Sequence, residues 1–216
     1  MSQDSQLQQA VLAELTWEPR VTAANIGVTA KAGIVTLSGH VENYVEKYAA
    51  ETAAQRVKGV KAVAEELEVR LPSDIERDDS DIAEAALDRL AWDVSVPNDA
   101  IKVQVEKGLV TLTGELDWHY QREAAEHDVG GLYGVVDVCN LIAIKPRVNV
   151  SNLSGDITQA LHRSRFDAKT IKVSVDGGKV HLTGTAHSWH DREEAETTSW
   201  AAPGATDVQN DIVVVF

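Results

Sequence analysis

The sequence predicts an α+β protein made of three tandem α-β-β-α-β units, each a small three-stranded mixed sheet covered on one face by two helices. A Gly-x-Val-x-Leu-x-Gly segment occurs three times, over 33–39, 108–114 and 178–184. An alternating, strand-like segment precedes each copy, and a helix-like segment with a central alanine follows it. Matches in fixed register across three copies indicate that one structural unit is repeated along the chain.

The three repeats are predicted to span residues 1–72, 79–146 and 150–216. Polar, loop-like segments at 72–80 and 146–155 agree with this partition. A unit of roughly 70 residues is small for an independently stable core. We therefore expect the three units to pack on one another.

Each unit can be followed element by element. Apolar residues three and four positions apart predict an opening helix, and a glycine turn joins the two strands of a hairpin. The second helix starts at a capping-box-like pair in two repeats, Asn43 with Glu46 and Ser188 with Asp191. The last strand returns beside the hairpin through a right-handed parallel crossover.

Nine glycines receive structural roles in this interpretation. Three lie in the hairpin turns, three end the second strand, and three occupy the C′ position after the second helix. These glycines are Gly33, Gly108 and Gly178 in the turns, Gly39, Gly114 and Gly184 at the strand ends, and Gly59, Gly134 and Gly204 after the helices.

This ordered set of motifs resembles the BON domain (bacterial OsmY and nodulation), and the resemblance covers nearly the whole chain. It rests on the glycine segments, on a helix alanine and on a Gly-Val pair, although Ala205 replaces the usual valine in the third repeat. The matching residues beyond the glycine segments are Ala50, Ala125 and Ala195 in the helices, and Gly59-Val60, Gly134-Val135 and Gly204 after them.

The resemblance implies a non-catalytic binding protein, without a cofactor, of a bacterial stress-response (osmotic) or envelope-associated system that contacts phospholipid surfaces. The alternative is a soluble module for protein–protein interaction or cation (potassium) sensing with no lipid affinity. The chain is acidic, with 20 basic and 34 acidic residues and a net charge of −14. This charge excludes a nucleic-acid partner and disfavours electrostatic attraction to anionic lipid.

Aromatic and histidine side chains gather at the predicted start of the second helix in every repeat. Tryptophan and tyrosine at such a place suit the boundary between lipid headgroups and acyl chains. The structural alternative is a hydrophobic staple that fixes the angle at which the chain enters the helix. The contact hypothesis rests on Tyr44, Trp118, His119, Trp189 and His190.

Two histidines in the third repeat are candidates for metal ligands or catalytic groups. His187 and His190 lie three residues apart and close to Asp191, but no third or fourth ligand is evident. Together with Glu193 and Glu194 they show no nucleophile spacing. The sequence therefore predicts neither a metal site nor an enzyme.

Three large aromatic residues and one cysteine are assigned to packing. Trp17 and Trp92 end the first helices of their repeats, with Phe166 as the counterpart, and we expect them to pack in the cores. The single cysteine, Cys139, is expected to be a buried inert thiol.

The N-terminal residues lack a basic segment followed by a continuous apolar run, and no apolar stretch is long enough to cross a membrane. This pattern predicts a cytoplasmic protein without a transmembrane segment, or a periplasmic protein if a signal peptide has been removed. The sequence leaves the oligomeric state open.

Overall fold

The computed structural model describes residues 2–71, 77–97, 99–146, 152–164 and 168–215. The first repeat contains α1 (Gln3–Trp17), β1 (Ile26–Lys31), β2 (Ile34–Val41), α2 (Tyr44–Gln55) and β3 (Ala62–Val69). The second contains α3 (Asp79–Trp92), β4 (Ile101–Glu106), β5 (Leu109–Leu116), α4 (His119–Gly130) and β6 (Asp137–Ile144). The third contains α5 (Leu153–Leu161), β7 (Lys172–Asp176), β8 (Lys179–Ala186), α6 (Trp189–Trp200) and β9 (Asp207–Val214).

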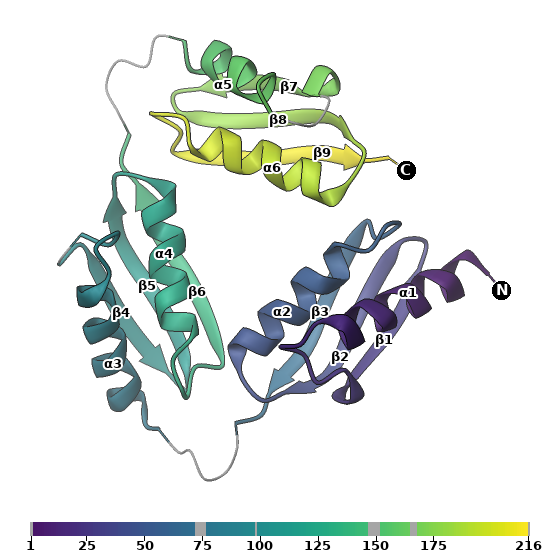
Figure 1. Ribbon diagram of the computed structural model, residues 1–216. Coiled ribbons are helices and arrows are strands. Elements are labelled where there is room, and N and C mark those ends of the chain that lie inside the picture. The colour runs from purple at the N-terminus through teal and green to yellow at the C-terminus, as the bar shows by residue number, and fades with distance from the viewer. Residues whose placement is uncertain (1, 72–76, 98, 147–151, 165–167, 216) are drawn as a thin grey trace. The chain divides into compact units, whose positions relative to one another are not determined.

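Each repeat forms its own three-stranded mixed sheet, with the second strand of the repeat in the middle. In the first repeat β1 runs antiparallel to β2, and β2 runs parallel to β3, so Leu37 faces Val28 on one side and Glu65 on the other. The third repeat has the same pairing. Figure 1 shows the two helices of the first repeat on one side of its sheet. The predicted α+β class and strand order are confirmed.

Both central residues of each hairpin turn have positive φ. Two consecutive residues of this kind define the type I′ turn, whose twist matches that of antiparallel strands. The pairs are Ala32 (52°) with Gly33 (87°), Lys107 (53°) with Gly108 (76°), and Gly177 (56°) with Gly178 (98°). The three turn glycines thus have the positive φ that glycine tolerates.

The sequence predicted that each second strand ends at its second glycine, and this prediction is wrong. They continue to Val41, Leu116 and Ala186. Gly39 lies inside β2 with φ of 125°, and a Cβ atom there would overlap the carbonyl oxygen of Asn25. The residue is therefore glycine because the chain leading into β1 passes directly over it, and Gly114 and Gly184 show the same close approach.

The glycines after the second helices also lie later than predicted. In the first repeat α2 ends at Gln55 with Arg56 as its C-cap, and Gly59 follows in a further turn before β3. The N–H of Val60 donates to the carbonyl of Val57 within this turn. The positive φ that favours glycine is present, at 100° for Gly59, but the position is not C′.

The core of the first repeat lies between its helices and one face of its sheet. Val11 and Leu15 of α1 pack over Val35 and Leu37 of the central strand. The α2 side of this core is made of small residues, Ala50, Ala53 and Ala54. These alanines let the helix backbone approach the sheet closely, which explains the alanine that recurs in every repeat.

The prediction that Trp17 and Trp92 pack in the cores is wrong. Their exposed fractions are 84% and 86%. Each follows a buried leucine by two positions, Leu15 and Leu90 respectively. Two positions along a helix correspond to roughly 200°, so each tryptophan lies on the opposite face from the core. Phe166 lies outside the described residues.

Cys139 lies in β6 and is half-buried rather than buried. Leu141, two residues further along the strand and therefore on the same face, is exposed. The thiol therefore belongs to the face of the third strand that is turned away from the core.

Candidate functional site

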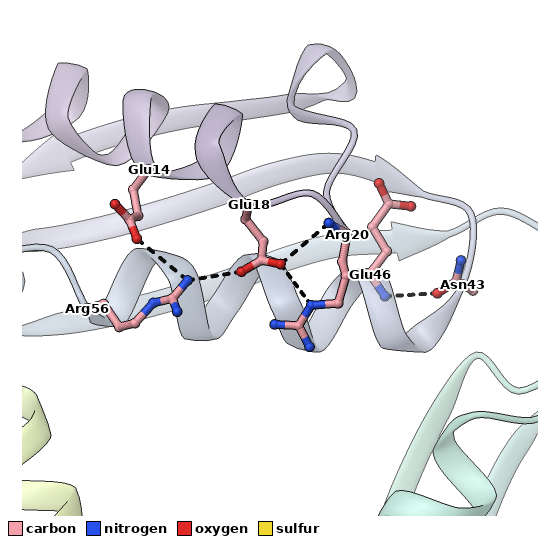
Figure 2. Close-up of polar contacts among 6 residues, drawn as sticks. All are labelled: Glu14, Glu18, Arg20, Asn43, Glu46 and Arg56. Atoms are coloured by element: carbon pink, nitrogen blue, oxygen red, sulfur yellow. Dashed lines mark hydrogen bonds and ion pairs between the residues drawn. The ribbon is translucent and has the colours of Figure 1, made fainter.

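In the first repeat, the end of α1 and the start of α2 are held together by one buried carboxylate. Asn43 caps α2 by accepting a hydrogen bond from the Glu46 N–H at 2.8 Å, as its position predicted (Figure 2). The Glu46 carboxylate accepts hydrogen bonds from the N–H groups of Thr22 (2.6 Å) and Glu42 (2.9 Å). Because only 4% of Glu46 is exposed, these bonds satisfy a charge that would otherwise be costly to bury. The chain leaving α1 is thereby tied to α2.

A second carboxylate, Glu18, joins the same elements through ion pairs (Figure 2). It accepts from Nε of Arg20 at 2.8 Å and from Nη2 of Arg56 at 3.1 Å. Arg56 also lies 3.5 Å from Glu14. The hydrogen bond from Arg20, helped by Arg56, lowers the pKa of Glu18 to about 2. Glu46 thus ties the chain that follows α1 to the start of α2, and Glu18 ties the end of α1 to the C-cap of α2.

The other two repeats build the start of the second helix with different groups. Gln121 stands where Glu46 stands in the first repeat, and its side-chain oxygen accepts from the N–H groups of Asp117 (3.2 Å) and Trp118 (3.1 Å). In the third repeat Ser188 caps α6 by accepting from the Asp191 N–H at 3.1 Å, as predicted. The position of the second helix is therefore fixed locally in all three repeats.

The predicted contact residues lie at the start of the second helix in their own repeats. Tyr44, His119 and Trp189 are the first residues of α2, α4 and α6, and Trp118 precedes α4 directly. These four side chains are half-buried, whereas His190 is exposed. In the third repeat the guanidinium carbon of Arg192 lies 5.0 Å from the centre of the Trp189 ring. The aromatic rings therefore combine a packing role with a partly accessible face.

The most exposed aromatic side chains were not among the predicted contact residues. Trp17 ends α1, and the exposed residues Val45 and Tyr48 lie in the first turns of α2. Val45 and Tyr48 share the start of α2, whose position Glu46 fixes against the chain that follows α1. In the second repeat Trp92 and Tyr120 occupy the positions equivalent to Trp17 and Val45, and both are exposed. We call Trp17, Val45, Tyr48, Trp92 and Tyr120 the exposed apolar set.

A polar cluster lies between the second helix and the third strand, and it recurs in register. In the first repeat Nζ of Lys47 lies 3.0 Å from the Glu65 carboxylate. In the second, the Asn140 side chain donates to Glu126 at 3.0 Å. The equivalent third-repeat residues are Arg192, Glu196 and Asn210. The sequence analysis missed this cluster, although the repeat register contains it.

Arg192 shows what the cluster does. Its guanidinium donates to the backbone carbonyl oxygens of Asn210 (2.6 Å) and Ile212 (3.2 Å) in β9. The Asn210 side chain donates in turn to Glu196 at 2.9 Å. β9 is at the edge of its sheet, where unpaired carbonyls attract other strands. The cluster supplies hydrogen-bond donors to two carbonyl groups of this strand and so disfavours the addition of a further strand.

In the part of the chain that the structure describes, no group of three or more His, Cys, Asp or Glu side chains is placed to hold a metal ion. His190 lies 3.8 Å from Glu194 on the same helix. Within the same residues, no helix combines the length and the apolar character that crossing a membrane requires.

Comparison with known proteins gives a family match along most of the chain. A profile of the BON domain matches residues 3–70, 78–146 and 149–215. Osmotically-inducible protein Y of Escherichia coli (strain K12) is 31% identical over 147 residues, which cover 66% of this chain and 73% of that protein.

Two solved structures of CdsD, a structural protein of the type III secretion system of Chlamydia trachomatis, also match the chain. The first, of the C-terminal domain, is 18% identical, covers 100% of both chains and has a TM-score of 0.27. The second is 19% identical, covers 97% of this chain and 92% of that chain, and has a TM-score of 0.25. Superposition scores this low do not establish a shared arrangement of the whole chain.

Proposed function

Because the chain belongs to the BON domain family, we propose that it is a non-catalytic binding protein of an osmotic-stress or envelope-associated system. The E. coli relative is named for osmotic induction, and 73% of its length matches this chain. An envelope-associated function favours the periplasmic alternative over the cytoplasmic location predicted from the N-terminal residues.

We further propose that the protein contacts phospholipid surfaces through apolar side chains. The observation that carries this proposal is the exposure of Trp17 and Trp92, at 84% and 86%, in equivalent positions of two repeats. An exposed tryptophan is stabilised when its ring enters the headgroup region, because its apolar body leaves water while its N–H keeps polar partners. Tyr48 and Tyr120 add exposed apolar area in the same two repeats.

The residues predicted from sequence support this surface in a second way. Tyr44 and His119 start the helices that carry Tyr48 and Tyr120, and Trp189 starts the equivalent helix of the third repeat. All three are half-buried, and one face of the His119 ring is stacked on Trp200 with the ring centroids 3.9 Å apart, so Tyr44 and Trp189 add most to the contact area. His190, which is exposed beside Trp189, belongs to the same surface in the third repeat.

The charge of the chain decides what kind of lipid surface is favoured. With a net charge of −14, the protein is repelled by an anionic leaflet, where basic segments gain about 1 kcal/mol per Lys or Arg. Binding must therefore come from apolar contact. Neutral vesicles are expected to bind the protein at least as well as anionic vesicles.

The same charge favours a second candidate function. An acidic protein with exposed aromatic side chains also suits a protein partner, because tryptophan and tyrosine are enriched in protein interfaces. In this alternative the exposed apolar set meets a protein surface, and the chain has no lipid affinity.

Co-sedimentation with liposomes separates the two functions. The unmodified chain is compared with the double variant Trp17→Ala, Trp92→Ala, and with the control Leu87→Ala, which removes an exposed apolar residue from the side of α3. The lipid proposal predicts that the double variant loses most of its binding and that the control keeps it. If the unmodified chain does not sediment with any vesicle, the lipid proposal is wrong and the protein-partner function takes its place.

A further inference from the structure

Asp128 of the second repeat is a buried carboxylate with half of its hydrogen bonds missing. Only 7% of the residue is exposed. Its Oδ1 accepts from Nε of Arg89 on α3 at 3.2 Å. Its Oδ2 is shielded from solvent and finds no donor. A buried carboxylate oxygen without a donor is strongly destabilised when the group is ionised.

The nearest acidic neighbour of Asp128 lies at the end of α3. Asp93, the C-cap residue of that helix, is within hydrogen-bonding reach of the Asp128 carboxyl group. Ionised carboxylates can only accept hydrogen bonds. Two carboxyl groups can therefore hydrogen-bond to each other only when one of them carries a proton.

The first repeat shows that this arrangement is particular to the second. Glu18 stands at the position of Asp93, but it is paired with two arginines, Arg20 and Arg56. The position of Asp128 is occupied there by Ala53, which is fully buried in the core. At these two positions the second repeat thus has two carboxyl groups, whereas the first repeat has an alanine and one carboxylate that is paired with two guanidinium groups.

We propose that Asp93 and Asp128 share a proton and form an acid-stabilised link between α3 and α4, so that the second repeat is more stable at mildly acidic than at neutral pH. Arg89 and Asp93 are charged groups that face Asp128 at this link. When Asp128 is ionised, its shielded Oδ2 carries charge without a donor, which weakens the contact between the helices.

The direction of the pKa shift agrees with this geometry. Burial, followed by the neighbouring Asp93, raises the pKa of Asp128, while Arg89 opposes the change. An acid with a raised pKa binds its proton more tightly in the folded state than in the unfolded state. The resulting stability is fully present below the unfolded pKa and is lost as the pH rises through the folded pKa.

Nuclear magnetic resonance on the full chain tests the proposal. The side-chain carboxyl resonances are titrated, and amide hydrogen exchange of α3 and α4 is compared at about pH 5 and about pH 7 after correction for intrinsic rates. Asp128 is expected to titrate at higher pH than an ordinary aspartate. Protection is expected to be higher at the lower pH.

Variants give the proposal a matched control. Asp128→Asn is expected to raise protection at neutral pH and to abolish its pH dependence, whereas Asp88→Asn leaves both unchanged. If Asp128→Asn does not fold, Asp93→Asn serves in its place, because it also removes one acid of the pair. Three results would overturn the proposal: Asp128 titrating in the ordinary range of aspartate, a pH dependence that survives both variants, or a shift of the Asp128 resonance on addition of Ca²⁺ at neutral pH that restores the protection.

Discussion

The Glu46 carboxylate accepts a hydrogen bond from the Thr22 backbone N–H at 2.6 Å, and so joins the chain leaving α1 to the start of α2. Twenty-four residues separate the two partners along the chain. The same carboxylate also accepts from the Glu42 N–H. One buried side chain therefore fixes the chain after α1 to the start of α2, the helix that carries Val45 and Tyr48.

Replacing Glu46 with alanine should weaken this end of the repeat. Two backbone N–H groups lose their acceptor, and a typical hydrogen bond contributes about 0.5–1.5 kcal/mol to stability. Glu46→Gln should cost less, because Gln121 performs the equivalent role in the second repeat. Hydrogen exchange of the α2 amides measures the loss. The control is Glu42→Ala, which removes an exposed side chain but keeps the backbone bond; equal losses in Glu46→Ala and Glu42→Ala would contradict the account.

The ion pairs of Glu18 should make the first repeat sensitive to acid. Its pKa is lowered to about 2, so the charged form is favoured by folding. The stability contributed by this group is present above its unfolded pKa and is lost as the pH falls toward about 2. Glu18→Gln should remove this part of the acid dependence. Acid unfolding followed by the resonances of α1 checks the effect, and Glu14→Gln, which removes only the 3.5 Å contact with Arg56, should change it less.

Gly39 should not tolerate a side chain. Its φ of 125° disfavours other residues, and a Cβ atom would overlap the Asn25 carbonyl. Gly39→Ala should therefore destabilise the first repeat by at least about 1–3 kcal/mol, the usual cost of a residue held in a sparsely populated conformation. Gly27→Ala in the neighbouring strand is the control, because a Cβ there meets only the flexible Ser38 hydroxyl at 3.1 Å. Similar urea midpoints for the two variants would argue against the close approach.

Removing Arg192 should open the edge of β9. In Arg192→Ala the carbonyls of Asn210 and Ile212 lose their donors, and Trp189 loses the guanidinium beside its ring. We expect lower stability of the third repeat and a greater tendency to aggregate through this strand edge. Light scattering and thermal unfolding measure both effects. Lys179→Ala, which removes an exposed cation from β8, should leave both unchanged; an aggregation rate that does not differ between the two variants would show that the edge is protected by other means.

The alignment of the three repeats predicted most of the fold. Segments such as Gly33–Gly39 and its two counterparts predicted the hairpins, the strand order and the helix starts, because turn conformation and alternation are local properties. Gly39 was predicted to end its strand but lies inside it, and Gly59 was predicted at C′ of α2 but lies beyond that position. Their positions depend on how the chain passes over the strand and on an extra turn after α2, which no local pattern records.

The surface was predicted less well than the core. Tyr44 and Trp189 were predicted as contact residues because aromatic residues recur at the helix starts, and Trp17 was assigned to the core because an aromatic residue recurs at the end of the first helix. Its spacing from Leu15 already places it on the outer face of α1, so the helical period contained the missing information. The link between Asp93 and Asp128 was beyond reach, since it depends on the packing of α3 against α4 and on the burial of one carboxylate.

Equilibrium binding of the unmodified chain to neutral phospholipid vesicles, measured at rising salt, bears on the proposed function without any substitution. Contact through Trp17, Trp92 and their exposed neighbours predicts binding that persists as salt is added, because salt does not screen apolar burial. Absence of binding to neutral vesicles at every salt concentration would contradict a lipid-contacting function for this chain.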